Sequence, residues 1–314
     1  MTGDPASAAR RTGSRKSYWL VFGAAFFWGT SATLARHLFR DRHVPPFTVV
    51  ELRLLIAAML LGAWLIWRKP SSLRIARRDA SYFLILGVFG LAAVQGCYYY
   101  SISVLGVGLS VLIQYLAPSL IVALDVARGR RVSAVTLVAV LADLGGTALL
   151  VGNVDPASLH AGPLQWAISF GATLSFVFFI LYSKRGLSRY PPETVLFYSL
   201  CVASVFWAFT SPPWRILAAG YGAALWVVFV LLALCSTLIP FALFYAGLRG
   251  LPAARAGVIS TIEPVVAVMS AAIFLGETLR PLQDLGALLV LGAAAVSSGE
   301  PHDAHPEPPR SRLS

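Results

Sequence analysis

Long hydrophobic stretches, separated by short polar connections, follow one another along almost the whole chain. They run to about 17 to 25 residues, which is enough for a helix to cross roughly 30 Å of hydrocarbon. Apolar residues do not alternate with polar ones at every second position, so the pattern favours membrane helices over barrel strands. The predicted spans are 18–36, 46–67, 82–104, 106–125, 132–152, 162–183, 192–210, 224–247, 252–275 and 281–299.

The second half of this pattern repeats the first at an offset of 146 residues. Matching pairs include Pro46-Phe47-Thr48-Val49 with Pro192-Glu193-Thr194-Val195, Tyr99 with Tyr245, Leu105 with Leu251, and Ala117-Pro118 with Glu263-Pro264. Because each copy holds five spans, an odd number, the two copies must enter the membrane from opposite sides. The sequence therefore predicts an all-α polytopic membrane protein of ten transmembrane helices, built as two inverted five-helix repeats.

The domain limits follow from this repeat. The first five-helix unit is predicted at 17–152 and the second at 160–299, joined by a turn at Asn153-Val154-Asp155-Pro156. Residues 1–16 and 300–314 are polar and Pro-rich, and we expect them to be disordered cytoplasmic tails.

Composition supports a membrane protein and excludes several other classes. Of the 314 residues, 57% are hydrophobic and 12% are charged, about half the charge of an average soluble domain. Cys97, Cys201 and Cys235 lie inside apolar spans, and their spacing forms no metal or redox motif. No nucleophile constellation, phosphate-binding loop or metal-ligand spacing is present, so we expect neither an enzyme nor a bound cofactor.

The net charge of +11 would suit a nucleic-acid partner, but the distribution of the charge argues against one. Of the 25 Lys and Arg residues, 19 fall on one side of the predicted topology, five fall on the other, and Arg53 lies within a span. The positive-inside rule then places both termini in the cytoplasm. The partners we expect are the lipid bilayer and a small-molecule substrate, with no nucleic acid.

A set of short motifs, in this order, resembles the drug/metabolite transporter superfamily, specifically its ten-helix EamA-domain group. The motifs are Phe27-Trp28-Gly29, a Pro-rich entry to the second span with Arg53, Ile262-Glu263-Pro264-Val265, and Leu275-Gly276-Glu277. The resemblance covers about 18–299. The first repeat departs from the family pattern, because Gly129 is followed by Arg130 where the family usually has an acidic residue.

This resemblance implies a central cavity and alternating access, with export or exchange of small metabolites such as amino acids, often coupled to protons. We therefore expect a secondary transporter of the plasma (inner) membrane that exports a small organic metabolite. Uptake of a similar solute and a non-transporting receptor or scaffold stay open as alternatives. A membrane-embedded lipid enzyme would need clustered acids or histidines, and His37 with His43 is a thin case for one.

Four ionisable residues fall within the spans: Glu51, Arg53, Asp143 and Glu263. Such residues are costly in lipid and usually face protein or water. Arg53 and Glu263 lie about 10 Å and 16 Å along their helices, near mid-membrane. Two interpretations of this pair stay open: contact with substrate or a coupling proton, and a buried pair that holds the halves together. For Asp143 we expect an interhelical hydrogen bond.

Two prolines at equivalent positions, Pro118 and Pro264, predict helix kinks in spans four and nine. A proline frees the carbonyl four residues earlier, here at Gln114 and Ser260. A free carbonyl beside a polar side chain would suit substrate recognition, whereas a kink needed only for packing is the alternative.

Aromatic and glycine residues complete the candidates. Gln95 and Tyr99 share a helix face, Tyr245 takes the place of Tyr99 in the second repeat, and Trp28 either lines the pathway or packs against a helix. The predicted substrate-binding residues are thus Trp28, Arg53, Gln95, Tyr99, Gln114, Tyr245, Ser260 and Glu263. Glycines in spans five and ten predict a packing face, which leaves a homodimer contact open.

Overall fold

The structure, a computed structural model, describes residues 15–31, 44–130, 132–152, 160–275 and 280–299. The predicted tails lie outside these ranges except for residues 15 and 16, which already belong to the first helix. His37, His43 and the Gly276-Glu277 element also lie outside them.

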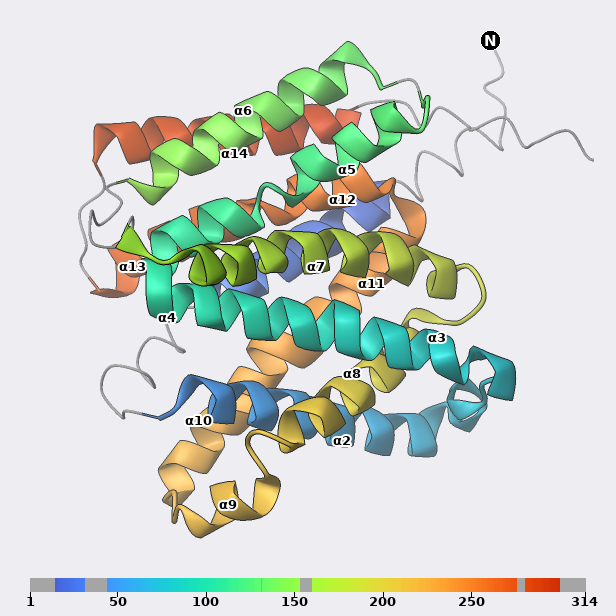
Figure 1. The fold of residues 1–314 in the computed structure, drawn as a ribbon. Coiled ribbons are helices and arrows are strands. Elements are labelled where there is room, and N and C mark those ends of the chain that lie inside the picture. Colours follow the sequence, from blue (N-terminus) through green and yellow to red (C-terminus); the bar gives the residue numbers. More distant parts are fainter. Residues whose placement is uncertain (1–14, 32–43, 131, 153–159, 276–279, 300–314) are drawn as a thin grey trace, which may run out of the picture.

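Every described regular element is helical, as predicted (Figure 1). After the helix 15–31, the first half contains α2 (Pro46–Arg68), η1 (Pro70–Leu73), η2 (Arg77–Asp79), α3 (Ala80–Ile85), η3 (Leu86–Ala92), α4 (Ala93–Gln114), α5 (Ala117–Ala127) and α6 (Ala134–Val151). The second half contains α7 (Pro163–Leu187), α8 (Pro192–Ala208), α9 (Pro213–Ala218), α10 (Ala223–Ala233), η5 (Leu234–Leu238), α11 (Ile239–Gly250), α12 (Ala253–Ser260), α13 (Ile262–Leu275) and α14 (Pro281–Gly299).

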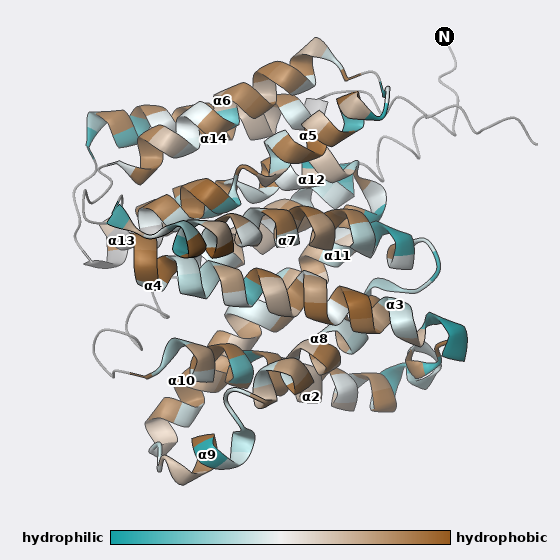
Figure 2. Cartoon of the chain, in the orientation of Figure 1, coloured by the Kyte–Doolittle hydropathy of each residue, from teal (hydrophilic) through white to brown (hydrophobic). Residues whose placement is uncertain are grey.

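In the described part of the chain, each of the ten predicted spans corresponds to helix. Seven described stretches are long and apolar enough to cross a membrane, and Pro192–Ala208 and Pro281–Ser297 are shorter apolar helices. The helix 15–31 accounts for the first span. The prediction of ten helices in two inverted five-helix repeats is confirmed. Figure 2 shows hydrophobic residues along the helices and hydrophilic ones gathered at the connections.

Equivalent helices of the two halves meet one another. α2 packs on α8 and α6 packs on α14, each pair joining a helix to its counterpart in the other repeat, and α5 of span four packs on α12 of span nine. The contact between α6 and α14 is the most extensive helix contact among the described elements. A Cβ at Gly146 would lie 2.8 Å from Gly286 O, so these glycines let the two backbones approach within the chain.

Irregular backbone occurs at equivalent places in the two repeats. η3 and η5 are π-helical turns within the third and eighth spans. Spans four and nine are each interrupted shortly before the predicted proline, at Tyr115-Leu116 and at Thr261. The kinks predicted from Pro118 and Pro264 are therefore breaks between two helices. Gly106 ends the third span with φ of 77°, a conformation that favours glycine.

Most of the described basic residues lie in the connections at one end of the bundle or in the helix ends next to them. We call it the basic end: it holds the segments 69–79, 128–130, 188–191 and 251–252, and lies on the right in Figure 1. The opposite end holds the start of α2 together with α9. α9 lies in the connection between α8 and α10, with Trp214 exposed.

Candidate functional site

Arg53 is buried in α2, one side of the contact between the two halves. Its guanidinium donates to the Tyr99 hydroxyl, to Thr237 Oγ1 at 3.0 Å and to Ser236 O at 3.3 Å. The last two acceptors belong to the π-turn η5 of the second half. All three partners are neutral, and three of the five N–H donors are used. The positive charge of Arg53 therefore has no anionic partner among the described residues.

Glu263 follows the break between α12 and α13. Its Oε2 accepts a hydrogen bond of 2.5 Å from the Tyr115 hydroxyl, and Tyr115 itself lies in the equivalent break between α4 and α5. Tyr98 lies close enough to Glu263 for their charges to interact. Glu263 keeps some accessible surface, whereas Tyr115 is buried. The described hydrogen-bond partner of Glu263 is therefore a neutral group, as are the partners of Arg53.

Arg53 and Glu263 come from opposite halves and do not form an ion pair with each other. They are close enough to interact electrostatically. Contact with a solute and a structural role in holding the halves together therefore both stay open for this pair. Arg53 lies about 10 Å from the start of α2 and Glu263 about 15 Å from the start of α12, so both lie well inside the helical bundle.

A second carboxylate, that of Asp143, accepts a hydrogen bond from the helix break before α13. The Thr261 hydroxyl donates to Asp143 Oδ1 of α6, which is the interhelical hydrogen bond expected of Asp143. Asp143 also interacts electrostatically with Tyr115. Both helix breaks are thus held by a hydroxyl donating to a carboxylate of another helix. This fixes the irregular backbone on which Glu263 sits.

The helix 15–31 reaches this site through Trp28 and Gly29. A Cβ at Gly29 would lie 2.6 Å from Glu263 O, so only glycine lets the helix pass this close. Trp28 packs on Phe241 and Phe244 of α11, with ring centroids 5.1 Å and 5.6 Å away. Trp28 is partly accessible. Packing and contact with the pathway therefore both stay open for this residue.

The other predicted residues occupy different environments. Gln95 Nε2 and Gln114 Oε1 are buried without a hydrogen-bond partner among the described residues. The Ser260 hydroxyl donates to Ala256 O of its own helix at 2.7 Å. Tyr245 is fully buried, and Ser183 donates to its hydroxyl at 3.4 Å. The structure brings Arg53, Tyr99 and Glu263 into one region and directs Ser260 to its own backbone.

Sequence reasoning missed Tyr115, Tyr98 and Thr237. Tyr115 and Thr261 are equivalent in the repeat and lie three residues before their prolines, a signal that could have singled them out. Thr237 contacts a residue 184 positions away, and an apolar span gives no sign of a π-turn. That contact could be found only from the fold.

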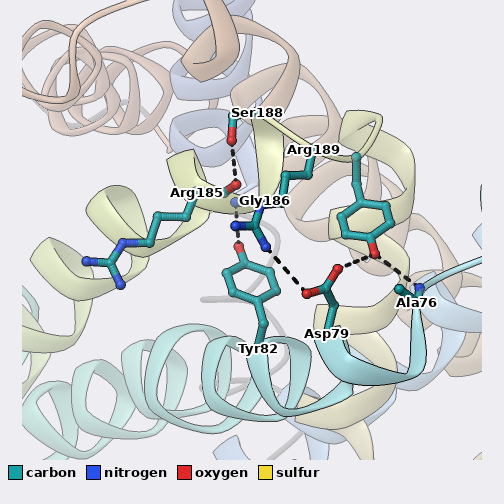
Figure 3. A network of polar contacts seen from close by, with 8 residues as sticks. Ala76, Asp79, Tyr82, Arg185, Gly186, Ser188 and Arg189 are labelled. Carbon is teal, nitrogen blue, oxygen red and sulfur yellow. Dashed lines mark hydrogen bonds and ion pairs between the residues drawn. The ribbon is translucent and has the colours of Figure 1, made fainter. Parts of the chain in front are cut away.

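A second polar cluster joins the halves at the basic end (Figure 3). Asp79 accepts from the Tyr190 hydroxyl at 2.6 Å and pairs with Arg189 at 3.4 Å. Tyr82 donates to Tyr182 O and accepts from Gly186 N, both at 3.1 Å. The bond to Asp79 raises the pKa of Tyr190, so its hydroxyl stays a donor through neutral pH.

Further contacts extend this cluster along the same end. Lys69 pairs with Glu193 at 2.7 Å, Thr194 donates to Ser72 O and Tyr198 to Leu73 O, both at 2.7 Å. We call the whole set, residues 69–82 with 182–198, the basic-end network. It ties the connection after α2 to α7 and α8.

No group of three or more His, Cys, Asp or Glu among the described residues is placed to hold a metal ion. The described contacts of the central site are hydrogen bonds of Arg53 and Glu263 with neutral hydroxyl and carbonyl groups.

Comparison with known proteins relates the chain to membrane transporters. The threonine/homoserine exporter RhtA of Escherichia coli K12 is 34% identical over 270 residues, which cover 85% of this chain and 84% of the relative. The inner membrane transporter YicL of Salmonella typhimurium LT2, described as uncharacterized, is 26% identical over 294 residues, 91% of this chain and 96% of the relative.

The fold is also found among solved structures. A crystal structure with 22% sequence identity matches with a TM-score of 0.72, over 90% of this chain and 96% of that chain. The model of the EamA-like transporter family matches residues 15–152 and 165–299, which together include both five-helix halves. The chain therefore belongs to the EamA-like transporter family.

Proposed function

We propose that this transporter exports a small zwitterionic solute of the amino-acid class across the inner membrane. The observation that carries the proposal is the pair Arg53 and Glu263, which come from opposite halves, form no ion pair with each other and are hydrogen-bonded to neutral groups. A solute with a carboxylate and an ammonium group would neutralise both charges at once. Charge-assisted hydrogen bonds are about twice as strong as neutral ones, so both ends of such a solute would be recognised.

The relative RhtA supports this class of solute, since its name gives threonine and homoserine as its cargo. Both are amino acids with a hydroxyl group on a short side chain. The unpartnered Gln95 and Gln114 amides offer further polar contacts for such a group. Tyr98, Trp28 and Phe241 would cover the apolar part.

We further propose that the basic end faces the cytoplasm, with both termini, and that the halves move against one another. The excess of Lys and Arg at this end supports the orientation. The basic-end network supports the motion, because its contacts run between the two halves and are polar and partly exposed. Such contacts are weak one by one, so they can be broken and remade during a transport cycle.

Counterflow in proteoliposomes tests the solute class. Vesicles loaded with unlabelled L-threonine should accumulate labelled L-threonine, and L-homoserine should compete. Threonine methyl ester, which lacks the carboxylate, and N-acetylthreonine, which lacks the ammonium group, should not compete. Glu263→Gln should weaken competition by free threonine about tenfold or more, since a charged hydrogen bond is lost. Equal competition by the zwitterion and both blocked analogues would contradict the proposal.

Inside-out membrane vesicles and whole cells test the orientation of the protein and the direction of transport. Protease or impermeant labels applied to inside-out membrane vesicles should reach the segment 69–79 and both termini. Net solute movement out of whole cells, absent in cells without the protein, would support export over uptake. Labelling of the basic end from the outside of intact cells would contradict the proposed orientation, and net solute movement into whole cells would contradict export.

A further inference from the structure

Glu51 is a buried carboxylate that the proposed solute site does not use. It lies in α2 with no exposed surface. Its Oε1 accepts a hydrogen bond of 3.1 Å from Ser204 of α8, and its Oε2 has no hydrogen-bond partner among the residues that the structure describes. One hydroxyl donor is little support for a carboxylate removed from water.

No charged group among the described residues forms an ion pair with Glu51. The described elements packed on α2 are α8, α10, η5, α4, η1 and α9. Their titratable or charged groups nearest this level are Arg215 of α9, Cys201 of α8, Cys235 of η5 and the α4 tyrosines, and none of them interacts electrostatically with Glu51. Arg53, on the same helix, turns to Tyr99 and η5 instead. An ionised carboxylate here would be buried without a counter-charge.

Such a group is stable in this place only with a proton bound. Transfer of an isolated ionised carboxylate into a low-dielectric interior costs far more than transfer of the neutral acid. The neutral acid can keep the hydrogen bond with Ser204. Ionisation would therefore favour any movement that returns Glu51 to water, and protonation would favour the closed contact seen here.

Because Glu51 lies between a helix of the first half and a helix of the second, such a movement would separate the two halves. α2 and α8 are equivalent helices of the two repeats, and Glu51 with Ser204 lies in their contact toward the opposite end of the bundle. In the repeat, Glu51 corresponds to Phe197, which packs against Gly62 toward the basic end. The same contact is thus closed by a carboxylic acid at one end and by an aromatic ring at the other.

We propose that Glu51 is a proton-binding site that controls opening of the α2/α8 contact at the opposite end of the bundle. A proton taken from the water on that side allows Glu51 to be buried and the contact to close. Release of this proton to the water on the other side of the membrane leaves a carboxylate that draws the contact open. No bond other than O–H forms or breaks. In the orientation proposed above, the proton comes from outside the cell.

The first experiment needs no solute. Cys97, Cys201 and Cys235 are replaced by alanine, and Phe47→Cys is introduced at the opposite end, where Phe47 is 36% exposed and stacks on Trp207, one turn from Ser204. The rate of labelling by an impermeant maleimide is divided by the rate in the denatured protein at each pH. This ratio should rise about threefold or more between roughly pH 5 and 9, as the carboxylate ionises.

Three variants show which group causes the rise of the labelling ratio with pH. Glu51→Gln, which is neutral at every pH, should hold the ratio low and flat. Glu263→Gln should keep the rise, because it leaves Glu51 unchanged. Ser204→Ala should move the midpoint to higher pH, since the lost donor favoured the carboxylate. A flat ratio in the parent, or the same rise in Glu51→Gln, would overturn the proposal.

A transport measurement tests whether proton binding at Glu51 is coupled to solute transport. This test rests on the proposed function. In proteoliposomes, an inward proton gradient should stimulate L-threonine efflux by the parent. Glu51→Gln should keep equilibrium exchange of L-threonine and lose the stimulation. Stimulation that survives in Glu51→Gln would overturn the coupling. If the parent exchanges no L-threonine, the proposed solute is wrong, and the labelling result still decides the proton site.

Discussion

The two ends of the α2/α8 contact are related by the internal repeat, yet they are held together by different interactions. At the basic end, Asp79 binds Tyr190 and Arg189. The counterparts of Asp79 and Tyr190 at the opposite end are Leu225 and Val44, which belong to one hydrophobic cluster. A hydrogen-bonded network and an apolar cluster thus occupy equivalent places.

A second pair of equivalent positions shows the same difference. Lys69 and Glu193 form an ion pair at the basic end. Their counterparts are Arg215 and Phe47, and Phe47 stacks on Trp207 at 5.1 Å instead of meeting a charge. Exposed ion pairs are weakened by salt, whereas buried apolar area is not. The two ends should therefore respond differently to conditions although the backbone is repeated.

The centre shows how far the side chains have diverged on a shared backbone. The π-turn η3 packs on α8, and the π-turn η5 packs on α2, as the repeat requires. Only the second of these turns meets an arginine, because the counterpart of Arg53 is Ser199. Glu263 likewise corresponds to Ala117. The backbone repeat supplies two similar niches, and the charges turn them into one asymmetric site.

The largest expected difference between these two niches is in threonine counterflow, when Arg53→Gln is compared with Ser199→Ala. Loss of the guanidinium removes the positive charge and its forked donors, so threonine counterflow should fall about 100-fold. Ser199 donates to Val195 O of its own helix and also contacts the Tyr245 hydroxyl. Because both contacts are between neutral groups, its replacement should change counterflow by less than about threefold.

Folding and solute binding are separated by two further measurements on the same pair. Arg53→Lys keeps the charge but not the fork and should recover only part of the activity. The melting temperature of each purified variant shows whether the fold is intact. Equal loss in the Arg53 and Ser199 variants would mean that both niches serve the solute alike, against the asymmetric site.

The contact between α6 and α14 is a region where the halves remain alike, since glycine brings both backbones together. A Cβ at Gly146 would lie 2.8 Å from Gly286 O, whereas one at Gly145 meets nothing within 4 Å. Gly146→Ala should therefore destabilise the protein by about 2 kcal/mol, and Gly145→Ala should be neutral or slightly stabilising. Thermal unfolding in detergent measures both. Equal melting temperatures would mean that the two helices separate without cost.

Much of this architecture was predictable from sequence, for identifiable reasons. The ten helices follow from apolar stretches that only helices can place in lipid, and the interruptions follow from Pro118 and Pro264. Arg53 and Glu263 were found because charge is rare in such stretches. Their separation was not predictable, since it depends on Tyr115 and Thr237, neutral residues 148 and 184 positions from their partners.

The basic-end network shows the other limit of the sequence. Its arginines were visible as a topology signal, but nothing in the pattern pairs Asp79 with Tyr190, 111 residues away. Polar residues in connections are ordinary, and most face water. Only the packing of the connection after α2 against the end of α7 shows which of them bind one another.

The smallest expected effect tests the difference between the two ends directly. Asp79→Asn keeps an acceptor for Tyr190 but removes the charge that attracts Arg189, a loss of about 1 kcal/mol or less. Amide hydrogen exchange of the segment 69–80 should become a few times faster, and high salt should accelerate the parent toward the variant. The segment 213–226, held by the apolar cluster with Ile216 and Phe229, should exchange at the same rate in low and high salt. If salt accelerates both segments equally, the ends are held by the same kind of interaction, and the asymmetry has to be sought in the central charges alone.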